Sequence, residues 1–489
     1  MISENRQRAL YIAGDLLATV SAWLVFSYIR FVMVGESENY SSFASFLGIR
    51  PVILGLILFP LGMSVLYWLS GYYNKVFIKS RIEELTTTLS TAFVGTIAIY
   101  FLAIVDDPIP DRATNYELLV MLFGLLFTFV YLERLTFTTL NSRRVASGKI
   151  AFNTVYVGSL ADVPGAIHRL ESGINHLSHA FRVVGILEWI SPTDKSRAPE
   201  LGKSEIAGLP VLSLNDMESF CRANDVRTIV VARSDCSPGE LLELINRLLP
   251  LEIPVLMSPS LVNLLTAKPR LNRLVADPFI DITTPYIAES TINMKRAGDF
   301  IGALIAAILL IPTYLVIAIA VKLDSKGPVI YTQKRIGLHR KPFYILKFRT
   351  MIVDAEASGP RLSSENDPRI TRVGRFLRKY RLDELPQFIN VIAGNMSLVG
   401  PRPERDHYIQ QILENAPYYT LLHCVRPGIT SLGMVKHGYA SSIDEMIQRM
   451  HYDLIYIENV SFTTDLKIIA YTIATVMSCL LYTSPSPRD

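Results

Sequence analysis

Two adjacent carboxylates, Asp383 and Glu384, have the residue types and the setting to do chemistry. They lie between a basic run at 375–381 and a second basic segment at 401–403. A carboxylate beside several arginines is expected to stay ionised, because a nearby opposite charge favours the charged form. An ionised Asp can serve as a nucleophile, and a Glu neighbour can bind a hard cation through oxygen. The pair is therefore a candidate for nucleophilic chemistry assisted by a metal ion.

The residues after the pair bear on its local structure. Pro386 disfavours the α region for Leu385, so we expect a helix to begin near Pro386, with the carboxylates at or just before its start. The free N–H groups of a helix start favour a bound phosphate. A solvated helix with mixed charges is the alternative, and taken alone the pair favours that alternative.

A series of motifs around the pair decides between these interpretations. In chain order they read KFRTM at 347–351, DPRITRVGR at 367–375, RLDELP at 381–386, GNMSLVGPRPE at 394–404 and RPGIT at 426–430. The ordered series resembles the monotopic phosphoglycosyl transferases, which are bacterial sugar transferases acting on polyprenyl phosphate. The resemblance covers about 290–481, and several motifs in fixed order are far more specific than any one of them.

The resemblance implies a two-step transfer. A UDP-sugar and undecaprenyl phosphate would give undecaprenyl-diphosphate-sugar and UMP, with Asp383 as the nucleophile that carries the phosphosugar between the two steps. Glu384, together with Asp383, would hold Mg²⁺, which neutralises charge on the diphosphate. Pro401, Arg402 and Pro403 stand where the family holds the uridine.

Five basic residues are candidates to clamp phosphate oxygens, and each has an alternative role as a surface charge. They are Lys347, Arg349, Arg369, Arg375 and Arg381.

Two positions depart from the family pattern. Asn395 stands where Asp is usual, and SLGM at 431–434 replaces a GLAQ-like run. Neither touches the carboxylate pair, so they bear on sugar choice rather than on the reaction. UDP-glucose or UDP-galactose is the expected donor, because long members with a four-span front end commonly use hexoses.

Composition indicates a membrane protein. The 489 residues are enough for two or three domains, half of them are hydrophobic, and the mean hydropathy is +0.30. The net charge of +4 is mild, and no nucleic-acid partner is expected. The four cysteines at 221, 236, 424 and 479 have no metal-ligand spacing and predict reduced thiols.

Four apolar segments in the first third, at 9–34, 52–69, 88–105 and 118–140, are each near the length that crosses a bilayer. Eight Lys or Arg residues flank one side of these segments against two on the other, which predicts that both ends of the bundle are cytoplasmic. Asp15, Glu133 and Arg134 are the polar exceptions within the segments. We expect Glu133 and Arg134 to snorkel at the inner end, and a transport pathway is the disfavoured alternative.

Between 153 and 280 the pattern changes to alternating strands and helices. Strands are predicted at 154–158, 181–188, 226–232 and 253–258, and helices at 163–171, 216–224 and 239–249. Such alternation indicates a parallel, Rossmann-like sheet. The turn at 158–165 lacks GxGxxG, so a structural or regulatory module is expected, and a metabolite sensor is the alternative.

A fifth apolar run, at 300–321, has basic residues at both ends and Pro312 at its middle. Pro312 removes a backbone hydrogen bond and breaks the helix. Together these features predict a re-entrant helix that dips into the inner leaflet and returns, as the resemblance also implies. The alternative is a kinked fifth span, which would place the motifs outside the cell, away from nucleotide sugars.

The predicted fold class is a membrane protein, α plus α/β. It comprises a four-helix transmembrane bundle (1–145), a Rossmann-like regulatory or structural domain (146–285), and a re-entrant helix with a monotopic catalytic domain (286–481), while 482–489 forms a tail outside the fold. The expected location is the bacterial inner (cytoplasmic) membrane, with the catalytic domain on the cytoplasmic face of the lipid bilayer. A homodimer is an open possibility. The reaction would be the first membrane step of exopolysaccharide, capsule or O-antigen synthesis.

Two other functional classes stay open. A membrane-anchored nucleotide-sugar-modifying enzyme of the dehydratase type would combine similar domains, but it needs the glycine-rich turn that is missing here. A non-catalytic membrane scaffold would fit the bundle, yet it gives no reason for the motif series.

Overall fold

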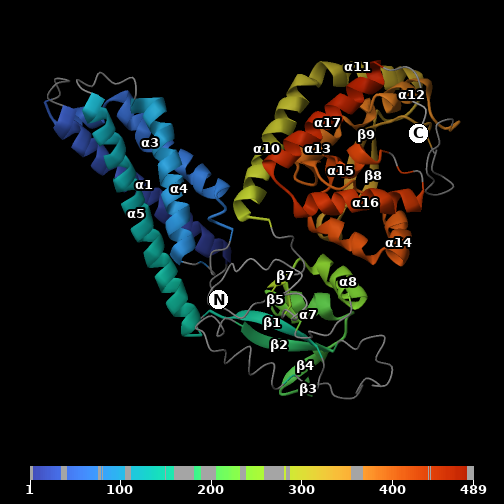
Figure 1. The fold of residues 1–489 in the computed structure, drawn as a ribbon, viewed down its shortest axis with the longest axis horizontal. Helices are drawn as coiled ribbons and strands as arrows, with labels where there is room; N and C mark the ends of the chain where they lie inside the picture. Colours follow the sequence, from blue (N-terminus) through green and yellow to red (C-terminus); the bar gives the residue numbers. More distant parts are fainter. Residues whose placement is uncertain are drawn as a thin grey trace.

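The computed structural model describes residues 4–34, 41–74, 79, 81–104, 112–148, 150–158, 163, 181–188, 205–231, 238–257, 280–281, 287–353, 367–438, 440 and 442–481. The described chain forms an N-terminal helical bundle, a sheet domain and a C-terminal mixed domain (Figure 1). The predicted membrane class with α and α/β parts is confirmed.

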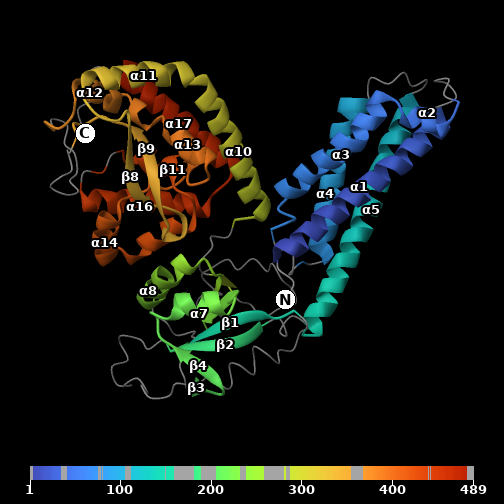
Figure 2. The ribbon, with the colours of Figure 1, turned by 180° about the vertical axis from the view of Figure 1, so that it is seen from behind.

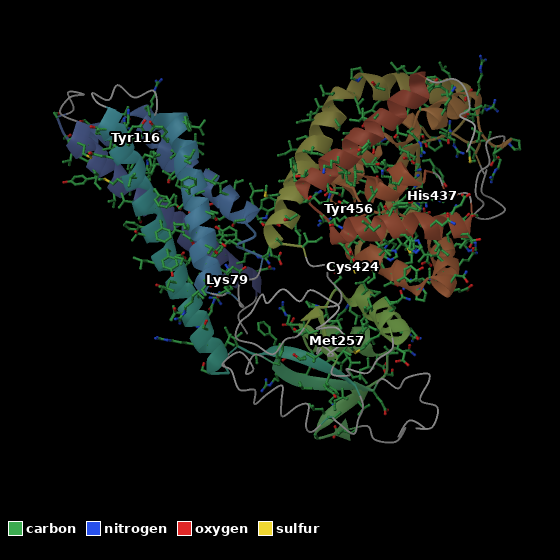
Figure 3. The ribbon with its side chains drawn as sticks, in the orientation of Figure 1. Lys79, Tyr116, Met257, Cys424, His437 and Tyr456 are labelled. Carbon is green, nitrogen blue, oxygen red and sulfur yellow. The ribbon has the colours of Figure 1, made fainter. Side chains whose placement is uncertain are left out.

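The N-terminal bundle is built from four long helices. They are α1 (Glu4–Val34), α3 (Arg50–Leu69), α4 (Arg81–Ile99) and α5 (Arg112–Ala146), joined by the short helix α2 (Phe43–Leu47) and the π-helix η1 (Tyr100–Ile104). Within the described ranges these four are long and apolar enough to cross a membrane, as the apolar segments predict. Lys79 and Tyr116 lie at opposite ends of the bundle, and the Lys79 end is the one nearer the sheet domain (Figure 3).

An ion pair inside the bundle corrects the prediction that Arg134 snorkels. Arg134 is fully buried, and its Nε and Nη2 donate to the two carboxylate oxygens of Asp15 at 2.8 and 3.0 Å. Its Nη1 donates to Thr88 Oγ1 at 3.0 Å, and Tyr73 Oη donates to Asp15 Oδ2 at 2.8 Å. The side chain points across the bundle toward α1. Asp15 neutralises the guanidinium inside the bundle, so Arg134 does not need to reach the lipid headgroups.

The sheet domain has strands β1 (Phe152–Gly158), β2 (Phe181–Glu188), β3 (Glu205–Ile206), β4 (Leu209–Leu212), β5 (Thr228–Val231), β6 (Val255–Met257) and β7 (Ile280–Asp281). Its described helices are α7 (Met217–Ala223), α8 (Pro238–Leu248) and the 3₁₀ turn η4 (Leu249–Leu251).

The strand order is β3-β4-β2-β1-β5-β6-β7. The core from β4 to β6 is parallel, as predicted, and β3 and β7 pair antiparallel at the edges. These two-residue edge strands are too short to leave a periodic signal in the sequence. The predicted helix at 163–171, apart from Val163, and most of the glycine-poor turn lie outside the described residues, and the Rossmann-like assignment stays a prediction.

The C-terminal domain contains the whole motif series. Its elements are α10 (Glu289–Leu309), α11 (Ile311–Asp324), β8 (Ile330–Ile336), η5 (Leu338–Arg340), β9 (Pro342–Phe348), α12 (Arg372–Lys379), η6 (Leu382–Glu384), α13 (Gln387–Ile392), β10 (Ser397–Val399), α14 (Asp406–Asn415), η7 (Pro417–Cys424), β11 (Gly428–Thr430), α15 (Leu432–Lys436), α16 (Ile443–Glu458) and α17 (Phe462–Leu481). The tail at 482–489 lies outside the described residues.

Two small sheets and a packed helical layer hold this domain together. β8 and β9 form an antiparallel hairpin, and β10 pairs in parallel with β11. Ile409, Ile412 and Met450 are buried in the core that α14 and α16 share. Tyr456 lies inside the helical layer (Figure 3), where its hydroxyl donates to Asp465 Oδ1 at 2.7 Å and lies 3.2 Å from Val399 O.

The fifth apolar run is broken, as Pro312 predicts. α10 and α11 meet at Leu310 with a bend of 61°, and Pro312 lies in the first turn of α11. In both views the two helices run along the outside of the C-terminal domain (Figure 2). Their outer faces expose apolar side chains such as Ile305, Leu309 and Leu315. An exposed apolar surface of this kind agrees with a broken span or a re-entrant element.

Polar contacts join the three parts. Asn74 of the α3–α4 connection donates to Glu289 at 2.8 Å, and Asn293 Nδ2 donates to Trp68 O at 2.6 Å, which ties the bundle to the start of α10. The turn between β8 and β9 contacts the sheet domain, where Lys341 pairs with Glu252 at 2.6 Å.

We predict that the Arg134–Asp15 pair is needed for bundle stability. Asp15→Asn leaves a buried guanidinium without its counter-charge and should cost about 3–5 kcal/mol, whereas Asp15→Leu with Arg134→Met should recover most of the loss. Thermal unfolding of the detergent-purified protein measures this. Glu218→Gln, in an exposed pair with Arg222, is the control and should leave the midpoint unchanged. A double variant as unstable as the single one would contradict the pairing.

Candidate active site

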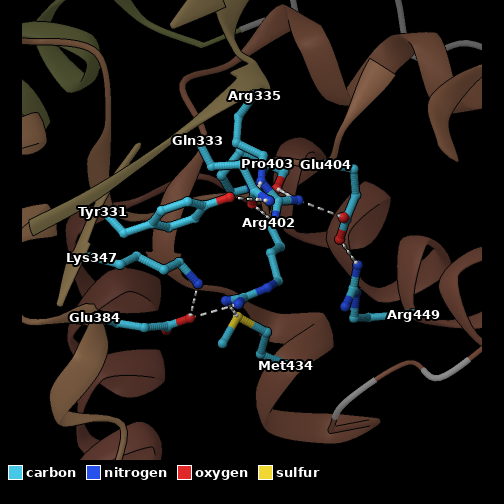
Figure 4. Close-up of polar contacts among 10 residues, drawn as sticks. All are labelled: Tyr331, Gln333, Arg335, Lys347, Glu384, Arg402, Pro403, Glu404, Met434 and Arg449. Atoms are coloured by element: carbon cyan, nitrogen blue, oxygen red, sulfur yellow. Dashed lines mark hydrogen bonds and ion pairs between the residues drawn. The ribbon is translucent and has the colours of Figure 1, made fainter. Parts of the chain in front are cut away.

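Three separate parts of the chain bring charged groups to one place. Lys347 comes from β9, Asp383 and Glu384 come from the 3₁₀ turn η6, and Arg402 follows β10. Lys347, Glu384 and Arg402 converge in the close-up (Figure 4).

Glu384 is the centre of this cluster. Its carboxylate oxygen Oε1 accepts from Lys347 Nζ at 2.9 Å and from Arg402 Nη2 at 2.7 Å, and the residue is 6% exposed. Burial alone would raise the pKa of Glu384, but Arg402 and Lys347 outweigh it and hold the pKa well below its usual range. Glu384 is therefore a buried anion stabilised by two cations.

Asp383 differs from its neighbour. It is 8% exposed, and its pKa is raised, first by burial and then by the adjacent negative charge of Glu384. Lys347, Arg378 and Arg381 offset only part of this effect. The expected direction was the opposite, because the sequence shows the neighbouring arginines but not the burial. A carboxylate with a raised pKa is more basic, which makes its ionised form the stronger nucleophile of the pair.

The backbone of this turn also departs from expectation. Leu385 has φ −55° and ψ −36°, which is the α region, although Pro386 follows it. Its amide donates to Leu382 O and its carbonyl accepts from Tyr314 Oη at 3.0 Å, so tertiary contacts override the local preference. Arg381 has φ +58° at the start of the turn. The helix expected near Pro386 is confirmed as α13.

Asn390 on α13 connects the helix that follows the carboxylate pair to the β8–β9 hairpin. Its Oδ1 accepts from Leu346 N at 3.0 Å, and its Nδ2 donates to Tyr344 O at 2.8 Å. These two hydrogen bonds pair backbone groups on the free edge of β9, and they fix the position of Lys347 relative to η6. Lys347 consequently reaches Glu384 across 37 residues of sequence.

Pro401, Arg402 and Pro403 line a narrow cavity of about 10 Å³, roughly the space of one water molecule, together with Glu404 and His423. Burial, and then the nearby Arg340, lower the pKa of His423 to about 3, so the His423 side chain is neutral at physiological pH.

The five basic residues predicted to clamp phosphate differ in their contacts. Lys347 contacts Glu384, and Arg381 lowers the pKa of both carboxylates. Arg375 is exposed on α12. Arg349 instead donates to Ser325 O at 2.7 Å, and Arg369 pairs with Asp367 at 2.6 Å.

Other charged residues of the site were not predicted from the sequence. Arg378 lowers the pKa of Asp383 and donates to Thr350 Oγ1 at 2.9 Å. Glu404 is buried between Arg335 and Arg449. The position of Glu404 directly after Pro401, Arg402 and Pro403 (the PRP segment) was an available signal, but no spacing pattern points to Arg335 or Arg449.

The carboxylates of the site are its possible metal ligands. Among the described residues no group of three or more His, Cys, Asp or Glu could form a cage. Mg²⁺ is often held by one or two carboxylates together with substrate phosphates. Asp383 and Glu384 fit that second arrangement.

The sequence comparisons agree with this geometry. A family model described as bacterial sugar transferase matches residues 290–479. A UDP-N-acetylgalactosamine-undecaprenyl-phosphate N-acetylgalactosaminephosphotransferase of Aeromonas hydrophila is 42% identical over 38% of this chain and 44% of its own length. A UDP-glucose:undecaprenyl-phosphate glucose-1-phosphate transferase of Escherichia coli (strain K12) is 32% identical over 66% of this chain and 68% of its own length.

A shorter relative marks the part of the chain that carries the family. The exopolysaccharide production protein PSS of Rhizobium leguminosarum bv. phaseoli is 38% identical over 38% of this chain and 96% of its own length. The matches, the apolar helices and the buried carboxylate pair together define a membrane-associated transferase. The chain belongs to the bacterial sugar transferase family, and it is a phosphoglycosyl transferase.

We predict that Arg402→Gln destabilises the protein in a pH-dependent way. The depressed pKa of Glu384 stabilises the folded protein at pH values above the pKa of the unfolded state, about 4.3. This stabilisation is lost as the pH falls through the pKa of the folded state. Without Arg402 the folded pKa rises, so the loss should be about 3–5 kcal/mol at pH 7 and smaller at pH 4.5.

Thermal unfolding midpoints at the two pH values measure the effect. Adding Glu384→Gln to Arg402→Gln should restore part of the stability at pH 7. Arg247→Gln, in an exposed pair with Glu243, is the control and should change neither midpoint. An equal loss at both pH values would show that Arg402 does not stabilise the Glu384 anion.

Proposed function

We propose that this protein transfers a sugar 1-phosphate from a UDP-sugar to undecaprenyl phosphate and releases UMP. The observation that carries the proposal is the buried Asp383–Glu384 pair, with Glu384 held between Lys347 and Arg402, in a chain of the bacterial sugar transferase family. Relatives named for transfer to undecaprenyl phosphate support the acceptor.

In the first step an Asp383 oxygen attacks the β-phosphorus of the UDP-sugar. The bond from that phosphorus to the bridging oxygen breaks, UMP leaves, and the phosphosugar is bound to Asp383 as an acyl phosphate. In the second step an oxygen of undecaprenyl phosphate attacks the same phosphorus and Asp383 leaves as a carboxylate. The two steps conserve all atoms and need no net proton transfer.

The residues around Asp383 suit both steps. Burial makes the carboxylate poorly solvated and more basic, while Lys347, Arg378 and Arg381 attract a diphosphate that would otherwise be repelled by two carboxylates. When bound by Asp383 and Glu384, Mg²⁺ would supply further neutralisation of the diphosphate charge. Arg402 keeps Glu384 ionised, so that Glu384 remains available as an oxygen ligand.

UDP-glucose or UDP-galactose is the proposed donor, in the first membrane step of exopolysaccharide, capsule or O-antigen synthesis. The relatives support a hexose, since their names specify glucose and N-acetylgalactosamine. The enzyme is proposed to act at the cytoplasmic face of the inner membrane, where nucleotide sugars are made.

The α10–α11 pair is proposed to be re-entrant. Near its start, Lys295 pairs with Asp465 at 2.6 Å and Asp299 accepts from Ser397 Oγ at 2.6 Å. At its end, Asp324 accepts from Val373 N at 3.0 Å. Because one domain holds both ends, a re-entrant path keeps that domain on a single side of the membrane.

We predict that Asp383→Asn lowers turnover by about 1,000-fold or more and leaves the unfolding midpoint near that of the wild type, since the amide keeps the shape but is a poor nucleophile. UMP release is measured with a panel of UDP-sugars, with and without undecaprenyl phosphate. Without lipid, the wild type should release one equivalent of UMP and gain the mass of a phosphosugar on the peptide that contains Asp383.

Asp444→Asn, an exposed carboxylate on the same domain, is the matched control and should retain full turnover. Glu384→Gln should lose most activity, and raised Mg²⁺ should restore part of it. Near-normal turnover of Asp383→Asn would overturn the covalent mechanism.

A second prediction concerns the path of α10 and α11. In a cysteine-free background, Ser290→Cys and Lys326→Cys should both react with an impermeant maleimide only from the cytoplasmic side, whereas Ser41→Cys should react from outside. Pro312→Leu restores a continuous helix of spanning length and should expose part of the Lys326→Cys population outside. Outside labelling of Lys326→Cys with Pro312 intact would rule out the re-entrant path.

A further inference from the structure

Glu404 is a buried carboxylate outside the Asp383–Glu384 pair. It is 6% exposed, and each of its oxygens meets a guanidinium from a different element. Arg335 on β8 approaches Oε2 at 3.1 Å, and Arg449 on α16 approaches Oε1 at 2.7 Å. Both carboxylate oxygens are therefore engaged (Figure 4).

The same contacts pin the backbone of the PRP segment to the hairpin. Arg335 Nη1 also donates to Pro403 O at 3.2 Å, and Ile336 N donates to Glu404 O at 3.1 Å. Arg335 is itself oriented by Gln333, whose Oε1 accepts from Nε and Nη2 at 3.0 and 2.7 Å. The main chain on the C-terminal side of Arg402 is thus fixed against β8.

The charge of Arg402 acts on two buried carboxylates, Glu384 and Glu404. Its Nη2 donates to Glu384 at 2.7 Å, and its Nη1 approaches Met434 Sδ at 3.5 Å. Glu404 is only two residues away along the chain, and the charge of Arg402 acts on it. Of these two carboxylates, it is Glu384 that forms an ion pair with Arg402.

We propose that Glu404, held by Arg335 and Arg449, is a positioning residue that directs Arg402 to Glu384. The physical reason is competition, because a carboxylate whose charge is already neutralised by two guanidiniums attracts a third cation less strongly. This inference rests on the proposed function, since it assigns Arg402 to the carboxylate pair. Arg449 and Arg335 thereby act on the site without touching the reacting phosphate.

The test uses substitutions with opposite expected effects. Arg449→Gln frees Glu404 Oε1, draws Arg402 away from Glu384, and should lower turnover by about 10–100-fold, the usual effect of losing an orienting partner. Arg449→Gln with Glu404→Gln removes the competing carboxylate and should return turnover to within about threefold of the wild type. Arg449→Lys keeps a cation at Oε1 and should retain most activity.

The split between kcat and KM separates positioning from a structural role. When Arg402 leaves Glu384, the KM for the UDP-sugar should rise together with the fall in kcat in Arg449→Gln, and both values should return in the double variant. A loss of folded protein would lower the apparent kcat and leave KM unchanged. Asp465→Asn, which removes a buried carboxylate paired with Lys295, is the control and should leave KM unchanged.

Unfolding midpoints confirm that the compared variants are folded. If Arg449→Gln does not fold, Arg335→Gln frees the other oxygen, and Arg335→Gln with Glu404→Gln is its rescue. A folded double variant no more active than its arginine single variant would overturn the positioning role. That result leaves the proposed function standing if the wild type still releases UMP and Asp383→Asn does not.

Discussion

The active-site domain depends on keeping one buried anion, Glu384, beside a second carboxylate. Burial and the charge of Asp383 both act against such an anion, so at least one close cation is required, and the structure supplies two. Lys347 comes from the hairpin and Arg402 from the segment after β10, so β9, η6 and the PRP segment must assemble together before the anion is stable. The same requirement leaves Asp383 as the more basic carboxylate, which is the property a nucleophile needs.

Buried ion pairs recur in the protein, and they share one design. In the bundle, Asp15 is held by Arg134 from another helix, and in the C-terminal domain Glu404 is held by Arg335 and Arg449. Such pairs contribute modestly to net stability, but a wrong pairing strands a charge in the interior and is costly. They therefore select one arrangement of helices and strands over its alternatives. In the catalytic domain that selection also decides which carboxylate Arg402 meets.

The apolar helices α10 and α11 are connected directly to the segment that carries the carboxylate pair. Tyr314 on α11 donates to the carbonyl of Leu385, the residue after the carboxylate pair. Arg296 on α10 donates to Val391 O and Ile392 O at the end of α13, the helix that follows the pair. The turn that presents Asp383 is thus held by these outer helices as well as by the hairpin. This arrangement suits the proposed transfer between a water-soluble donor and a lipid-borne acceptor.

Local patterns were enough to predict much of this protein. Hydropathy predicted the four long helices, alternation predicted the parallel core of the sheet, Pro312 predicted the break between α10 and α11, and the motif series predicted the family. Each of these signals is written in neighbouring residues, and hydrophobic periodicity needs no knowledge of distant contacts.

The tertiary structure alone decided how the charges are paired. Arg134 meets Asp15 across 119 residues, and among the arginines Arg402 meets Glu384 while Arg349 turns to Ser325. The raised pKa of Asp383 also depends on burial, which composition does not reveal. An isolated charge in a sequence has many possible partners, and only the packing of distant elements settles which partner is within reach and which group loses its water.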